Sequence, residues 1–296
     1  MKKVVAWALL AIVILLAVLG ATGALKDYGE TLAQFSEMQE LELEQIYVAA
    51  KPPGMGSVQA LAITPEYFVV TSRPPDEAAN GGENQNRLTI IDRTTMSDVT
   101  AQLKHAQATY DLGHANGMTY DPKRDELVVV GVRSTTDAHC DTAVRIRPDD
   151  FAVASSETLA GAASGIAYAG SGEYYVRTGS TIRKLNAKLQ PTGERFNFSS
   201  GLDVQDIAYH GGYIYLADWG AINNISWLRR IGLQLNRNVI YRVDGWTGEV
   251  EAFAVREPRQ ELESLDFADG ECYLLLNGVD DFRIYRVSGP LKTLMY

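Results

Sequence analysis

The chain has 296 residues, 46% of them hydrophobic and 22% charged, so it can bury a sizeable core and is neither disordered nor collagen-like. Its 27 basic and 37 acidic residues give a net charge of −10, which argues against nucleic acid as a partner because such a surface repels a polyanion. Two cysteines are too few for a disulfide framework or a four-cysteine zinc site.

The N-terminal segment predicts where the protein resides. Lys2 and Lys3 precede an uncharged apolar stretch, Val4–Leu25, which as a helix rising about 1.5 Å per residue can cross a hydrocarbon core of about 30 Å. Positive residues stay on the cytoplasmic side, so the rest of the chain is expected on the extracytoplasmic side of the cytoplasmic membrane. We interpret residues 1–25 as a single-pass signal anchor, with the membrane as a partner through residues 4–25. A cleaved signal peptide, giving a secreted protein, is the alternative.

Residues 26–43 contain no repeat unit and carry acidic residues at a loosely helical spacing, which predicts a stalk. From residue 44 onward the chain repeats a unit of short apolar runs with the strand period of two. The first run of each unit alternates small or polar residues with apolar ones: QALAI at 59–63, NGMTY at 116–120, SGIAY at 164–168, QDIAY at 205–209 and ESLDF at 263–267. The second runs are found at 67–73, 126–133, 174–179, 213–220 and 272–278, and the third runs at 88–93, 143–148, 181–186, 239–244 and 283–288.

Weaker fourth runs complete four of the units, at 99–104, 151–159, 194–198 and 249–255. Four short antiparallel strands per unit are typical of propeller blades, so we predict an all-β, five-bladed β-propeller over residues 44–296. The apolar run at 44–51 has no blade of its own and is expected to close the ring by pairing with the fifth unit. A sandwich and a β-helix are the alternatives.

The segment GHANGMTYDPKRDELVVVG at 113–131 and third runs ending in Arg-Val-Asp or Ile-Asp-Arg resemble bacterial extracytoplasmic propellers of the NHL, YVTN and gluconolactonase-like group. The resemblance covers most of residues 44–296 but describes blade packing more than chemistry. A gluconolactonase-like activity would imply a divalent cation in the channel. Asn116, Gln205 and Glu263, with Asp203 or Asp218, have suitable oxygen atoms, although that family has six blades and this chain shows five.

The start of a first strand and the end of a second strand lie on the same face of a propeller, beside the central channel. The candidate ligand-binding residues at these positions are Arg73, His114, Asn116, Arg133, Arg177, Gln205, Asp218, Trp219, Glu261 and Glu263. They either form a polar binding pocket at the channel mouth or satisfy backbone groups and water where the sheets converge. Long loops at 73–87 and 218–238 are expected on the same face.

The charges of this set are expected to divide into two arcs. Arg73, Arg133 and Arg177 come from three consecutive units, whereas the acidic residues come from units four and five. Such a mouth favours a zwitterionic or carboxylated ligand, with arginine forks on the anion and Trp219 as a stacking surface. The alternative is that these arginines brace neighbouring blades.

We therefore interpret the protein as a binding or scaffolding module of the cell envelope, without a resident cofactor. An envelope protein, a glycan or a small carboxylated ligand is the expected partner. The alternative is a hydrolase with its site at the mouth. It would be a glycosidase using two acids of blades four and five, or a metal-dependent lactonase. Zinc-protease, serine-hydrolase and P-loop motifs are missing from the sequence, so no catalytic residue is assigned.

Overall fold

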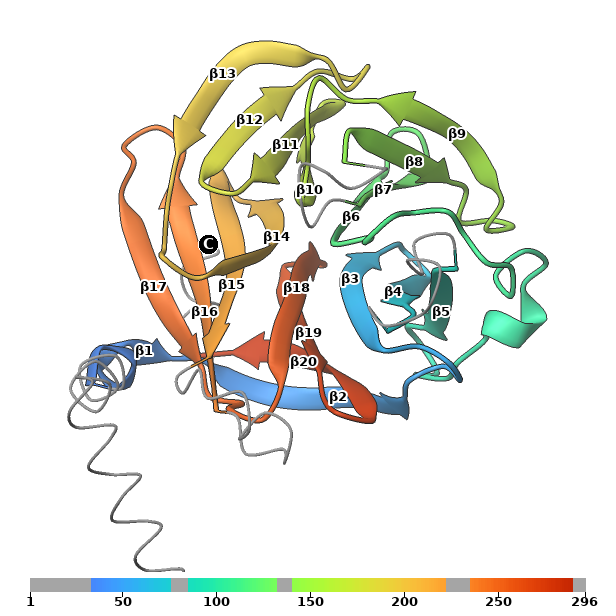
Figure 1. The fold of residues 1–296 in the computed structure, drawn as a ribbon, viewed down its shortest axis with the longest axis horizontal. Coiled ribbons are helices and arrows are strands. Elements are labelled where there is room, and N and C mark those ends of the chain that lie inside the picture. The colour runs from blue at the N-terminus through green and yellow to red at the C-terminus, as the bar shows by residue number, and fades with distance from the viewer. Residues whose placement is uncertain (1–32, 76–84, 132–139, 222–234, 290–296) are drawn as a thin grey trace, which may run out of the picture.

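The computed structural model describes residues 33–75, 85–131, 140–221 and 235–289, which form a ring of five sheets around a central axis (Figure 1). The protein is thus an all-β, five-bladed propeller, as predicted. The predicted membrane segment, residues 1–25, lies outside the described residues. Within these described ranges, no helix is long and apolar enough to cross a membrane.

The strands that each blade takes from its own repeat unit pair antiparallel and follow one another outward from the axis in chain order. The innermost strands are β3 (Ser57–Ile63), β6 (Gly117–Asp121), β10 (Gly165–Gly170), β14 (Asp203–His210) and β18 (Glu261–Ala268). The second strands are β4 (Tyr67–Arg73), β7 (Glu126–Val130), β11 (Glu173–Thr178), β15 (Tyr213–Ala221) and β19 (Glu271–Asn277). The third strands are β5 (Arg87–Asp92), β8 (Thr142–Ile146), β12 (Thr181–Leu185), β16 (Asn236–Asp244) and β20 (Asp281–Ser288). Fourth strands in blades 2, 3 and 4 are β9 (Val153–Thr158), β13 (Pro191–Asn197) and β17 (Val250–Val255).

The ring is closed by an N-terminal strand. Strand β2 (Glu42–Ala50) supplies the outer strand of blade 5 by pairing antiparallel with β20, in a register that sets Glu42 opposite Ser288 and Ala50 opposite Asp281. The predicted closure is therefore confirmed. It ties the first blade to the last and covers an edge that would otherwise be unpaired.

The fourth strand predicted for blade 1 at 99–104 is wrong. The blade has three strands, and a short 3-10 helix, η1 (Thr100–Gln102), lies beside β5 instead. The backbone N–H of Thr100 donates to Asp98 Oδ1 at 2.8 Å, and the Thr100 hydroxyl oxygen accepts from the N–H of Ile90 at 2.8 Å. These local side-chain bonds replace the ladder that a strand would have made.

The described part of the predicted stalk packs on blade 4. Residues 33–37 are helical, and Phe35 is buried against Val239 and Ala254. Strand β1 (Gln39–Glu40) then pairs parallel with β17 and adds a fifth strand to that sheet. The chain thus makes two sheet contacts, on blades 4 and 5, before blade 1 begins.

The hydrophobic core is divided among the seams between blades. Five clusters of buried apolar residues each join two neighbouring blades, such as Val128 and Val176 between blades 2 and 3, and Ile182 and Ile207 between blades 3 and 4. The faces of each sheet are covered by its neighbours, so the strand ends near the axis are left to carry polar side chains.

Candidate functional site

The candidate site lies where the five inner strands begin, around the axis of the ring (Figure 1). One residue from each inner strand start occupies the same position in the repeat, and all five are buried. They are Gln59, Asn116, Ser164, Gln205 and Glu263. Three of them fall at β-bulges, because the register between first and second strands shifts across Gln59, Gln205 and Glu263. A bulge leaves its extra residue out of the ladder and redirects its side chain.

Blade 5 contributes two carboxyl groups to this mouth. Glu263 is only 2% exposed and accepts a hydrogen bond from Asn277 Nδ2 at 2.9 Å. Glu261, two residues earlier and partly exposed, accepts one from Gln205 Nε2 of blade 4, also at 2.9 Å. The structure therefore places three of the predicted residues near one another: Gln205 bonds to Glu261, and the charge of Glu261 acts on Glu263.

The two carboxyl groups differ in their environment. Burial, followed by the negative charge of Glu261, raises the pKa of Glu263 well above its ordinary value. The hydrogen bond from Asn277 and the positive charges of Lys51 and Arg73 act in the opposite direction without cancelling this rise. Glu263 therefore holds its proton to a higher pH than an exposed glutamate does.

Lys51 is a residue of the mouth that the sequence analysis missed. Its Nζ donates to the carbonyl oxygens of Gly56 at 3.0 Å, Gly278 at 2.7 Å and Val279 at 3.0 Å, which joins blades 5 and 1. Burial lowers the pKa of Lys51, and the charge of Glu263 opposes that shift. The available signal was its position, one residue after the closing strand β2 and directly before two prolines.

Arg177, predicted to contact an anionic ligand, is engaged within the protein. Its side chain is 1% exposed, and Nη1 and Nη2 donate to the two oxygens of Asp218, which is 0% exposed. Arg177 Nε donates to the carbonyl of Gly179 at 3.2 Å, and the Ser200 hydroxyl also donates to Asp218. Two members of the predicted arcs thus neutralise each other across the seam between blades 3 and 4.

The other predicted residues lie around this centre. Partly buried His114 donates its backbone N–H to the carbonyl of Gly131 at 3.0 Å. Trp219 lies opposite Asp203 in the pairing of β14 with β15, and its buried Nε1 has no acceptor among the described residues. Arg133 falls outside the described residues, as do most of the predicted recognition loops.

Two buried amide oxygens at the mouth lack a donor within the described part of the chain. They are Oδ1 of Asn116, whose side chain is almost wholly buried, and Oδ1 of Asn277, whose Nδ2 is already given to Glu263. These two oxygens lie at the same mouth as the two glutamates, where the Trp219 indole N–H is likewise a buried group without a partner among the described residues. Buried polar groups are rarely left in this state without a reason.

Below the mouth the inner strands approach too closely for side chains. A Cβ added to Gly117 would lie 2.5 Å from Gly165 Cα, and one added to Gly165 would lie 2.9 Å from Ile207 Cγ2. Beside Gly165, Asp206 Oδ2 accepts from the Ser264 hydroxyl at 2.5 Å, and Ser264 Oγ accepts from the N–H of Leu61 at 3.0 Å. This layer fastens blades 4, 5 and 1 to one another and forms the floor of the mouth.

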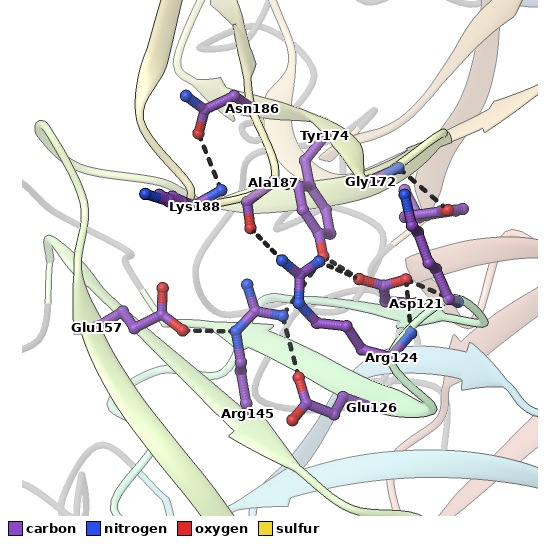
Figure 2. Close-up of polar contacts among 12 residues, drawn as sticks. Asp121, Arg124, Glu126, Arg145, Glu157, Gly172, Tyr174, Asn186, Ala187 and Lys188 are labelled. Carbon is purple, nitrogen blue, oxygen red and sulfur yellow. Dashed lines mark hydrogen bonds and ion pairs between the residues drawn. The ribbon is translucent and has the colours of Figure 1, made fainter.

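A second polar cluster lies at the other end of the seam between blades 2 and 3 (Figure 2). The Tyr174 hydroxyl donates to Asp121, and Arg124 Nη1 donates to the same carboxylate at 3.0 Å. Arg145, 4% exposed, donates to Glu157 at 2.6 Å and to Glu126 at 3.3 Å. The sequence analysis missed this brace, although an arginine inside the apolar run AVRIRP signals a buried partner. Among the described residues, no three His, Cys, Asp or Glu side chains gather as metal ligands.

Comparison with known proteins supports the fold and leaves the family open. No protein-family model matches the chain, and no curated protein matches its sequence. Its fold is similar to the crystal structure of a glutaminyl cyclase from Myxococcus xanthus, with a TM-score of 0.55 and 12% identity over 86% of this chain and 100% of the other. At that identity the likeness concerns the fold alone, and the resemblance to the NHL and gluconolactonase-like group gains no support.

Proposed function

We propose that the protein is a binding module whose ligand, a small zwitterion or amine, occupies the channel mouth. The observation that carries this proposal is a pair of amide oxygens, on Asn116 and Asn277, that lack a donor among the described residues and lie at the same mouth as the carboxyl groups of Glu261 and Glu263. A ligand that supplies N–H donors satisfies these atoms, and unsatisfied buried groups cost about 1–3 kcal/mol each. Arg177 is held by Asp218, so the proposal rests on the cationic part of the ligand.

Binding of free amino acids and short peptides to the purified full-length protein tests this proposal. Glu261→Gln keeps the shape of the side chain but removes its charge, so we expect amine binding to weaken about tenfold. Glu249→Gln, an exposed change on blade 4, is the matched control and should leave binding unchanged. Equal affinity of both variants, or binding of carboxylates that lack an amine, would contradict the proposal.

A second candidate function, acid–base catalysis, is favoured by the contrast between the two glutamates. Buried Glu263 has a raised pKa beside a partly exposed carboxylate, and such a separation suits one group to donate a proton and the other to accept it. A glycosidase or a lactonase would use this pair, and the lactonase would add a divalent cation with oxygen ligands such as Asn116, Gln205 and Glu263. The structural neighbour is named as an enzyme, a glutaminyl cyclase, which is consistent with a propeller that hosts a reaction.

One variant distinguishes the two candidate functions. Glu263→Gln removes the titrating group, so an enzyme should lose most of its turnover of a sugar, lactone or amide substrate while it still binds that substrate. A wild-type rate that falls as pH rises through the raised pKa of Glu263 would support the acid role. Elemental analysis and chelation of the purified protein test the divalent cation. Wild-type protein that binds amines without turning over any member of the panel supports the binding module.

We also propose that residues 1–25 anchor the protein in the cytoplasmic membrane, with the propeller on the extracytoplasmic side; the predicted stalk, residues 26–43, would then be limited to its part before residue 33, because residues 33–43 pack on blades 4 and 5. The support is the charge pattern of Lys2, Lys3 and Val4–Leu25. There an envelope protein or glycan could serve as the partner. Protease added to intact spheroplasts should digest the propeller and spare a cytoplasmic marker, whereas survival of both would reverse the orientation.

A further inference from the structure

Blade 3 sets two arginines directly opposite each other on its outer strands. The pairing of β12 with β13 aligns Arg183 with Arg195. The neighbouring aligned pair, Ile182 and Phe196, packs with apolar residues of blade 4. Successive strand residues point to opposite faces, so both arginines face blade 2. Like charges placed opposite each other on a sheet destabilise the pairing unless a counter-charge is present.

Arg183 is held in position by backbone carbonyl groups of the loop at 160–162, which leads from blade 2 into blade 3. Its Nη1 donates to the carbonyl of Ala160 at 2.5 Å, and its Nη2 donates to the carbonyls of Ala162 at 2.6 Å and Gly161 at 3.3 Å. Burial alone lowers the pKa of Arg183. A guanidinium has five N–H donors, so this anchoring leaves two of them for another acceptor.

No carboxylate of the described residues forms an ion pair with either arginine. The acids on the same sheet, Glu173 and Glu194, lie within 3.0 Å and 3.8 Å of Lys184 Nζ, on the face toward blade 4. On the facing wall of blade 2, Glu157 is taken by Arg145 (Figure 2). Among the described residues, the two guanidinium groups therefore have no counter-charge, on a chain whose net charge is −10.

A third donor extends the pair. Thr181 and Asn197 form the next aligned pair on the same face, and the Thr181 hydroxyl donates to Asn197 Oδ1 at 3.1 Å. That bond uses the amide oxygen, so the Nδ2 group is the free end of the exposed Asn197 side chain. The face thus gathers hydrogen-bond donors from three side chains.

We infer that Arg183 and Arg195, with Asn197, form a binding site for a phosphate or sulfate group, separate from the channel mouth. Guanidinium groups bind tetrahedral oxyanions through paired, charge-assisted hydrogen bonds. Arg183 is preorganised by its carbonyl contacts, and exposed Arg195 supplies the second fork. A bound oxyanion would also relieve the repulsion between the two side chains.

Titration calorimetry of the full-length protein with inorganic phosphate and with sulfate, against acetate at equal ionic strength, tests this inference. We expect both oxyanions to bind more tightly than acetate, and Arg195→Ala to weaken phosphate binding about tenfold. Lys184→Ala removes the same charge from the opposite face of the same sheet and should leave the affinity unchanged. A sugar phosphate measured in parallel distinguishes a site for the free ion from one for a phosphate ester.

The test uses Arg195→Ala and not Arg183→Ala, because Arg183 holds the carbonyl groups of the loop at 160–162 and its loss would change the fold as well as the site. Phosphate affinity no greater than that of acetate would overturn the inference. Equal losses in Arg195→Ala and Lys184→Ala would also overturn it, because they would reduce the effect to net charge. Amine binding at the mouth is measured separately, so either site can fail without the other.

Discussion

Blade 4 buries two carboxyl groups completely, and they face different neighbours. Asp218 faces blade 3, where both of its oxygens accept from the Arg177 guanidinium. Asp206 reaches blade 5, where it accepts from the Ser264 hydroxyl at 2.5 Å; it also accepts from the N–H of Ile207 in its own strand at 2.8 Å, and no cation of the described residues pairs with it. Burial accordingly raises the pKa of Asp206 well above its usual value. One seam thus compensates a buried acid with a cation, whereas the other surrounds it with neutral donors and raises its pKa.

The ion pair should be the most sensitive of these features to substitution. Arg177→Ala leaves the buried Asp218 carboxylate without its cation, so we expect the free energy of unfolding to fall by ~3–5 kcal/mol in urea denaturation. Replacing both partners, with Arg177→Met and Asp218→Leu, should restore most of that stability, because no charge is then buried. A single variant that costs less than about 1 kcal/mol would mean that water already reaches this seam.

The close approach of blades 3 and 4 can be broken without touching a charge. Gly165→Ala places a Cβ 2.9 Å from Ile207 Cγ2 and 3.1 Å from Asp206 Oδ1, so the neighbouring strand must move. We expect a loss of ~1–3 kcal/mol in the same denaturation assay. Gly245→Ala, at a turn glycine with nothing within 4 Å, is the control and should change stability by less than about 0.5 kcal/mol.

The fold was accessible from sequence because each blade repeats one pattern. All five inner strands and the closing strand follow from alternation and spacing, since β2 had no blade of its own to join. The segment 99–104 failed because side chains of Asp98 and Thr100 capture backbone groups locally. Apolar periodicity carries no information about such bonds.

The candidate site could be predicted from the sequence only in part. Equivalent repeat positions place Gln205, Glu261 and Glu263 at the starts of inner strands, because the repeat fixes which residue begins each of these strands. Which charges neutralise each other was not accessible, since Arg177 and Asp218 meet only through the placement of two adjacent blades. The bulge at Glu263 has no sequence signature either.

The smallest change in the free energy of unfolding at any one pH is expected from replacing Asp206, the buried acid whose pKa is raised. A carboxyl whose pKa is raised on folding holds a proton that the unfolded chain has released, so its contribution to stability falls as pH rises above about 4. Asp266, whose pKa burial raises to about 7, acts in the same direction. Asp206→Asn removes the titration while its amide can still bond to Ser264. The variant should therefore gain stability relative to wild type between pH 4.5 and 7.5, as measured by urea denaturation at each pH.

Asp150→Asn is the control, because Arg147 holds the pKa of Asp150 at about 2 and its titration lies below this window. A stability difference between Asp206→Asn and wild type that stays constant across the window would mean that Asp206 is ionised in the fold, and that the two seams of blade 4 do not differ in the way they bury an acid.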